Sequence, residues 1–118
     1  MEKILVVNND KDTMSLLKEL LERKSYNVKY TSNKEECITI AERFKPDIVL
    51  VDILQKNCVR DLKINQSTSV IPLILMTGYS WNEKNNEVEV DDIIEKPFFL
   101  DQLETIIKRT IAIKKATG

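Results

Sequence analysis

Histidine is absent from the 118 residues, and glycine occurs only twice, as Gly78 and Gly118. Without histidine the chain can build neither a Ser–His nor a Cys–His nucleophile pair, and it lacks the commonest metal ligand. Two isolated glycines can form neither a phosphate-binding P-loop nor the glycine fingerprint of dinucleotide-binding proteins. A conventional metabolic enzyme is therefore not expected.

Long apolar runs are also missing, since no segment approaches the roughly 20 residues that a membrane-spanning helix needs. The formal net charge of −1 gives no overall basic surface for nucleic acid. Met1-Glu2-Lys3 leads directly into an apolar run, so no signal peptide is expected. We expect residues 1–118 to form one cytoplasmic domain that binds neither membrane nor nucleic acid.

The two cysteines, Cys37 and Cys58, match no spacing of metal ligands. Cys37 falls in step with Ala41 and Phe44 on one face of a predicted helix. This position favours a small buried apolar side chain over a redox role. The residues around Cys58 favour no particular environment.

Four short apolar runs are each followed by polar residues. They are Ile4 to Val7 before Asn8-Asn9-Asp10, Ile48 to Val51 before Asp52, Ile71 to Met76 before Thr77-Gly78, and Ile93-Ile94 before Glu95-Lys96-Pro97. Continuous apolar runs rich in β-branched residues are typical of parallel strands covered by helices on both faces. Because parallel strands end at one edge of the sheet, Asp52, Thr77 and Lys96 are predicted to meet there, at the usual ligand crevice.

Strand and helix patterns alternate along the whole chain. We expect strands at 3–8, 27–31, 47–51, 70–76 and 90–94. We expect helices at 12–24, 57–66 and 100–111, and a short helix at 80–90. A further helix is expected to begin at a capping box, Ser32–Glu35, and to end at Phe44. This alternation predicts an α/β fold with a mainly parallel sheet and right-handed crossovers. Lys96–Pro97 is a candidate cis peptide bond.

The three polar side chains at the predicted strand ends suit phosphoryl transfer. An aspartate such as Asp52 can attack a phosphoryl donor and carry the group as an acyl phosphate. The transferred group needs its negative oxygens neutralised, which Lys96 can do, while Thr77 can donate a hydrogen bond to another oxygen.

The ordered set of these segments, which spans essentially the whole chain, resembles a receiver domain of two-component response regulators. The resemblance implies a flavodoxin-like (βα)5 fold, a doubly wound parallel sheet of five strands in a three-layer sandwich. It implies that Asp52 is the phosphoacceptor, Thr77 the switch hydroxyl and Lys96 the lysine that contacts the phosphoryl group. It further implies Mg²⁺ as cofactor, a histidine kinase or phosphotransfer protein as partner, and at most self-phosphotransfer and autodephosphorylation as activity.

The chain departs from the family pattern after its first strand, where two adjacent acids normally help to hold Mg²⁺. Asn8 and Asn9 occupy these positions, so Mg²⁺ binding is expected to be weakened by the loss of two charges. The expected ligands are Asp52, the carbonyl of Leu54 and the amides of Asn8 and Asn9. Asp10 either turns inward as a partial replacement or caps the following helix.

Two readings of the function remain open. The chain is either a receiver that is phosphorylated on Asp52 or a pseudo-receiver that binds partners without phosphorylation. In both cases the output is expected at a face made by residues 80–90, the strand at 90–94 and the final helix, with Tyr79 and Trp81 as exposed contacts. This face is also the expected interface of a homodimer.

Overall fold

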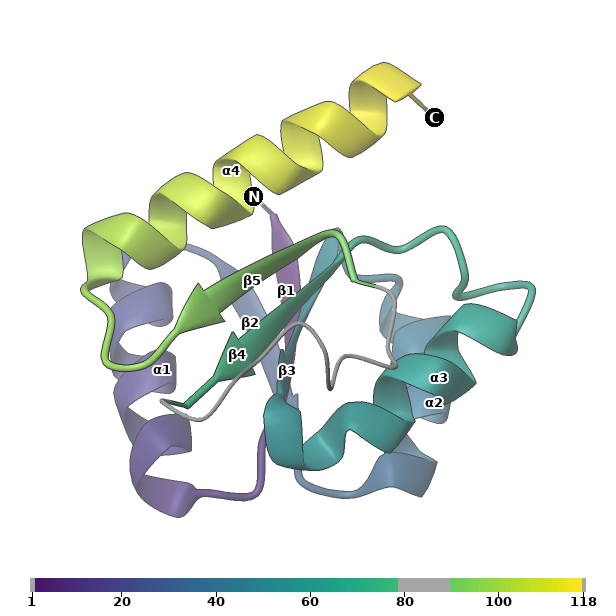
Figure 1. Cartoon of the computed structure of the whole chain (residues 1–118), viewed down its shortest axis with the longest axis horizontal. Helices are drawn as coiled ribbons and strands as arrows, with labels where there is room; N and C mark the ends of the chain where they lie inside the picture. The colour runs from purple at the N-terminus through teal and green to yellow at the C-terminus, as the bar shows by residue number, and fades with distance from the viewer. Residues whose placement is uncertain (1, 79–89, 118) are drawn as a thin grey trace.

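The computed structural model describes residues 2–78 and 90–117, which form a parallel sheet with helices on both faces (Figure 1). The elements in chain order are β1 Lys3–Val7, α1 Lys11–Arg23, β2 Asn27–Thr31, α2 Lys34–Phe44, β3 Ile48–Asp52, the 3-10 turn η1 Ile53–Gln55, α3 Lys56–Ile64, β4 Leu73–Thr77, β5 Asp92–Glu95 and α4 Leu100–Thr117. All strand pairs are parallel, in the order β2-β1-β3-β4-β5. The predicted doubly wound α/β fold is confirmed.

Each strand sends alternate side chains to opposite faces of the sheet, and each face has its own apolar core. On one face, Ile4 and Val6 of β1 pack with the apolar residues of α1 and α4, and on the other, Leu5 and Val7 pack with those of α2 and α3. Figure 1 shows these two helix pairs on opposite sides of the sheet. Burial on both faces explains why β1 and β3 are continuous apolar runs.

Some element boundaries differ from the sequence prediction. β4 begins at Leu73 rather than at residue 70, because Pro72 has no N–H for the ladder and the Ile71 amide bonds instead to the Thr68 carbonyl at 3.1 Å. α2 is capped by Asn33, whose side chain accepts hydrogen bonds from the amides of Glu35 and Glu36, and not by the predicted box at Ser32. The helix expected at 80–90, with Tyr79 and Trp81, falls almost wholly outside the described residues.

The two cysteines lie together between α2 and α3. Cys37 and Cys58 are both fully buried and are joined as a disulfide. The predicted burial of Cys37 in an apolar core is confirmed, whereas its pairing with Cys58 was not predicted. The pairing follows from the packing of α2 beside α3 on one face, which the sequence spacing does not show.

No helix within 2–78 or 90–117 has both the length and the apolar character that a bilayer crossing requires.

Candidate functional site

Asp52 is the last residue of β3 and is only 4% exposed, at the carboxyl edge of the sheet. Its Oδ2 accepts a hydrogen bond from Nζ of Lys96, which follows β5, and its Oδ1 accepts one from the Leu54 amide at 2.9 Å. The predicted meeting of Asp52 and Lys96 is therefore found in the structure. Both carboxylate oxygens have a donor, so the buried negative charge is balanced.

β4 lies between β3 and β5 and brings Thr77 to the same edge. The Lys96 amide donates to the Thr77 carbonyl at 2.7 Å, and the Lys96–Pro97 bond is cis as predicted. The Thr77 side chain is fully buried, and its Oγ1 has no hydrogen-bond partner among the described residues. Buried hydroxyls normally have a partner, so this one is available to a ligand atom.

Asn8 follows β1 and is 1% exposed. Its backbone N–H donates to the Thr31 carbonyl at 3.0 Å, and its side-chain Oδ1 accepts from the Asp10 backbone amide at 2.7 Å. Its Nδ2 has no partner within the described part of the chain. The side chain therefore has its oxygen occupied and its buried donor unused.

The remaining predicted metal ligands lie on the rim. Asp10 is exposed and is the N-cap of α1, accepting from the Asp12 amide at 3.2 Å. The hydrogen bond from the Thr13 hydroxyl is the main cause of the lowered pKa of Asp10. Of the two roles left open for Asp10, the structure shows helix capping. Asn9 is exposed, and Leu54 lies in η1 with its side chain 82% exposed.

The donors at this edge are oxygens of a carboxylate, side-chain amides and a backbone carbonyl, the kind of set that Mg²⁺ accepts. These oxygen ligands suit Mg²⁺ chemically, but Asp52 is the one that carries a full negative charge. No group of three or more acidic or cysteine side chains that could hold a metal occurs in the regions described.

Comparison with known proteins identifies the family of this chain. The family model of the response regulator receiver domain matches residues 4–108. The chain belongs to this receiver family. Receiver domains of response regulators bind Mg²⁺ in their active sites and interact with histidine kinases or phosphotransfer proteins.

Two curated relatives place this receiver domain in context. It is 31% identical to the transcriptional regulatory protein CpxR of Escherichia coli K12, over 93% of this chain and 51% of that protein. It is 32% identical to Protein PilH of Pseudomonas aeruginosa, over 96% of this chain and 98% of that protein. The chain thus spans about half the length of CpxR but nearly all of PilH.

Among solved structures, the receiver domain of the sensor histidine kinase PA1611 from Pseudomonas aeruginosa superposes with a TM-score of 0.86. The alignment covers 94% of this chain and 98% of that one at 21% identity, and that structure holds a magnesium ion in its active-site cleft. At this identity the likeness supports the flavodoxin-like receiver fold alone.

Proposed function

We propose that this receiver domain accepts a phosphoryl group on Asp52. The observation that carries the proposal is the buried Asp52 carboxylate, which is paired with Lys96 and flanked by the Thr77 hydroxyl, a group without a hydrogen-bond partner among residues 2–78 and 90–117. A carboxylate oxygen forms a bond to phosphorus while the bond from phosphorus to the donor breaks. Lys96 then neutralises a phosphoryl oxygen and Thr77 donates to another.

The Asp52–Lys96 pair opposes this reaction in the resting state. Both carboxylate oxygens already accept hydrogen bonds, so the lysine must leave Oδ2 before that oxygen can attack. The phosphoryl group offers Lys96 a new anionic partner, and the pair is exchanged rather than lost.

The test is incubation with Mg²⁺ and acetyl phosphate, followed by intact mass measurement. We expect the mass of one phosphoryl group to be added to the native chain and nothing to be added to Asp52→Asn. Asp47→Asn is the matched control, because Asp47 precedes the same strand at the opposite edge of the sheet. No added mass at millimolar Mg²⁺, and no beryllofluoride binding, would instead favour a pseudo-receiver.

We further propose that Mg²⁺ is held by Asp52, the Leu54 carbonyl and Asn9, and more weakly than in receivers with two acids. Asn8, whose side-chain oxygen is occupied, and Asp10, which caps α1, lie outside this set. At about 4 Å, each missing charge is worth about 1 kcal/mol in bulk water and about 4 at an intermediate effective dielectric. The weakening therefore amounts to at least an order of magnitude.

Asn9→Asp tests this weakening. The variant restores one carboxylate at an exposed position beside the site, so Mg²⁺ affinity measured by calorimetry is expected to rise about fivefold or more. Asn27→Asp, which adds the same charge at the exposed amino end of β2, is expected to leave the affinity unchanged. Equal effects of the two variants would show that only net charge matters.

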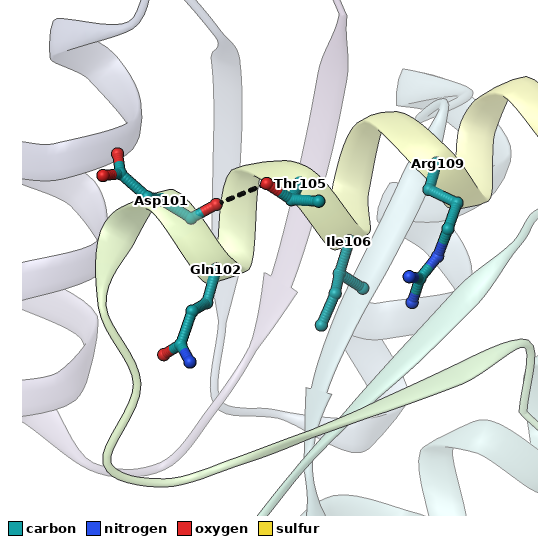
Figure 2. Close-up of a pocket in the computed structure, with 5 residues that line it drawn as sticks. All are labelled: Asp101, Gln102, Thr105, Ile106 and Arg109. Atoms are coloured by element: carbon teal, nitrogen blue, oxygen red, sulfur yellow. Dashed lines mark hydrogen bonds between the residues drawn. The ribbon is translucent and has the colours of Figure 1, made fainter.

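The proposed output surface is the face that includes β5 and α4. An open depression of about 400 Å³ lies on α4, lined by Asp101, Gln102, Thr105, Ile106 and Arg109 (Figure 2). Arg109 pairs with Asp92 of β5 at 2.5 Å, which joins the helix to the strand. We propose that a downstream protein or a second copy of the chain binds at this surface. We also propose that the domain is cytoplasmic. Chemical-shift changes on α4 after beryllofluoride addition would support this surface.

A further inference from the structure

The side chain of Asn8 has a fixed orientation. In the side chain of Asn8 only the oxygen accepts hydrogen bonds, so the 2.7 Å hydrogen bond donated by the Asp10 backbone amide identifies the atom that faces it as Oδ1. The NH₂ group is therefore at the opposite end of the planar side-chain amide from the atom that faces the Asp10 amide. It is buried and has no hydrogen-bond partner in the part of the chain that the structure describes.

The strand register places Asn8 beside Asp52. β1 and β3 pair in register through Val7 and Val51, and the next residues are Asn8 and Asp52. Two residues earlier, Val6 and Leu50 face the same core cluster. Because side chains alternate along strands, Asn8 and Asp52 lie on that same face of the sheet.

The oxygen of Asn8 is a poor candidate for a metal ligand. Binding a cation would compete with its hydrogen bond to the Asp10 amide, which helps to form the turn into α1. The NH₂ group does not coordinate a metal, because the lone pair of its nitrogen is delocalised into the carbonyl and its two hydrogens act only as donors. Its chemistry suits an anion.

We propose that Nδ2 of Asn8 donates a hydrogen bond to a terminal oxygen of the phosphoryl group on Asp52. This inference rests on the proposed phosphorylation of Asp52 and adds a residue to that site. An ionised acid at position 8 has no hydrogen to donate, so it can stabilise the phosphoryl group only through a bound cation. Asn8 stabilises the phosphoryl group by its own hydrogen bond, so phosphoryl binding by this receiver depends less on Mg²⁺.

Asn8→Asp is a close test because the two side chains have the same shape. The variant keeps an oxygen for the Asp10 amide but loses the donor. Beryllofluoride, which mimics the phosphoryl group, and Mg²⁺ alone are each titrated by calorimetry. At micromolar Mg²⁺ we expect Asn8→Asp to bind beryllofluoride about tenfold or more weakly than the native chain, as for loss of a hydrogen bond to a charged group. Its affinity for Mg²⁺ alone is expected to rise.

Two other variants separate donor loss from metal effects. Asn8→Ala removes the donor without adding charge, so beryllofluoride binding is expected to weaken while binding of Mg²⁺ alone stays unchanged. Asn9→Ala is expected to weaken binding of Mg²⁺ alone. Thermal unfolding midpoints check that each variant folds. If Asn8→Asp does not fold, the beryllofluoride affinity of Asn8→Ala tests the role of the Asn8 donor.

The outcomes distinguish this inference from the proposed function. If the native chain binds beryllofluoride and the Asn8 variants bind it equally tightly at micromolar Mg²⁺, the role of Asn8 is overturned and phosphorylation of Asp52 stands. If Asn8→Ala loses Mg²⁺ and beryllofluoride affinity to the same extent, Asn8 is a metal ligand. If the native chain does not bind beryllofluoride at any Mg²⁺ concentration, both proposals fail.

Discussion

The amino and carboxyl edges of the sheet carry similar polar residues and use them differently. At the amino edge, Asp47 accepts from the Lys3 amide at 2.8 Å and Asp91 accepts from the Leu73 amide at 2.7 Å. At the carboxyl edge, buried atoms of Asn8 and Thr77 have no hydrogen-bond partner within the described part of the chain. The amino edge therefore contributes stability, whereas the carboxyl edge keeps unsatisfied groups for a ligand, as functional sites commonly do.

Lys96→Met is the change with the largest expected effect on this comparison. It removes the cation from the buried Asp52 carboxylate, and we expect the free energy of unfolding to fall by about 2 to 3 kcal/mol, with loss of beryllofluoride binding. The value lies below that of a fully buried pair because the Lys96 side chain is 30% exposed. Urea unfolding measures it.

A double variant sharpens this result. Adding Asp52→Asn to Lys96→Met removes the unpaired charge while keeping an acceptor for the Leu54 amide. Most of the lost stability is therefore expected to return. Strictly additive losses in the two variants would contradict the pairing.

Asp91→Ala probes the amino edge and is expected to have an intermediate effect. The Leu73 amide loses its acceptor, and Lys63 loses a partner at 3.7 Å, so the free energy of unfolding should fall by about 1 to 2 kcal/mol. Beryllofluoride affinity should not change. Asp91→Asn keeps an acceptor oxygen and should lose clearly less stability. Reduced beryllofluoride affinity in Asp91→Ala would show that the two edges are not independent.

The smallest expected effect is a pH dependence at the amino edge, where Tyr26 is 7% exposed. Burial, followed by the nearby Glu104 and Glu2 carboxylates, raises the pKa of Tyr26 to about 12, from 10.0. Between these pH values the folded chain keeps a proton that the unfolded chain has lost. Stability from this group is therefore complete below pH 10 and declines as the pH rises towards 12.

Tyr26→Phe removes this contribution. Urea unfolding at several pH values should give a shallower loss of stability above pH 10 in the variant than in the native chain. Tyr30, whose pKa is also raised by burial, keeps part of the slope in both proteins. Identical slopes would show that Tyr26 does not contribute.

The sequence predicts the features that depend on local pattern. The apolar runs of β1 and β3 can be recognised because both faces of these strands are buried, and the endings of the runs predict that Asp52 and Lys96 meet. The choice of Asn33 over Ser32 as a helix cap could not be predicted, since both residue types cap helices well.

Features that depend on contacts between separate elements could not be predicted. The pairing of Cys37 with Cys58 requires α2 and α3 to pack side by side. The orientation of the Asn8 amide depends on one hydrogen bond to the Asp10 backbone. From its residue type alone, Asn8 was predicted to be a weak metal ligand. The hydrogen bond that occupies its oxygen shows instead that Nδ2 is the atom left without a partner among the described residues.

The strand order also affects how the chain folds during synthesis. β1 is made before the other described strands of the sheet but lies inside it, between β2 and β3. It therefore cannot complete its hydrogen bonds until residues up to Val51 have left the ribosome. Until then the edge of β1 that pairs with β3 stays open, as is typical of folds that depend on pairing between distant strands. Because Lys96 follows the last strand, the Asp52–Lys96 pair can form only when most of the chain has been synthesised.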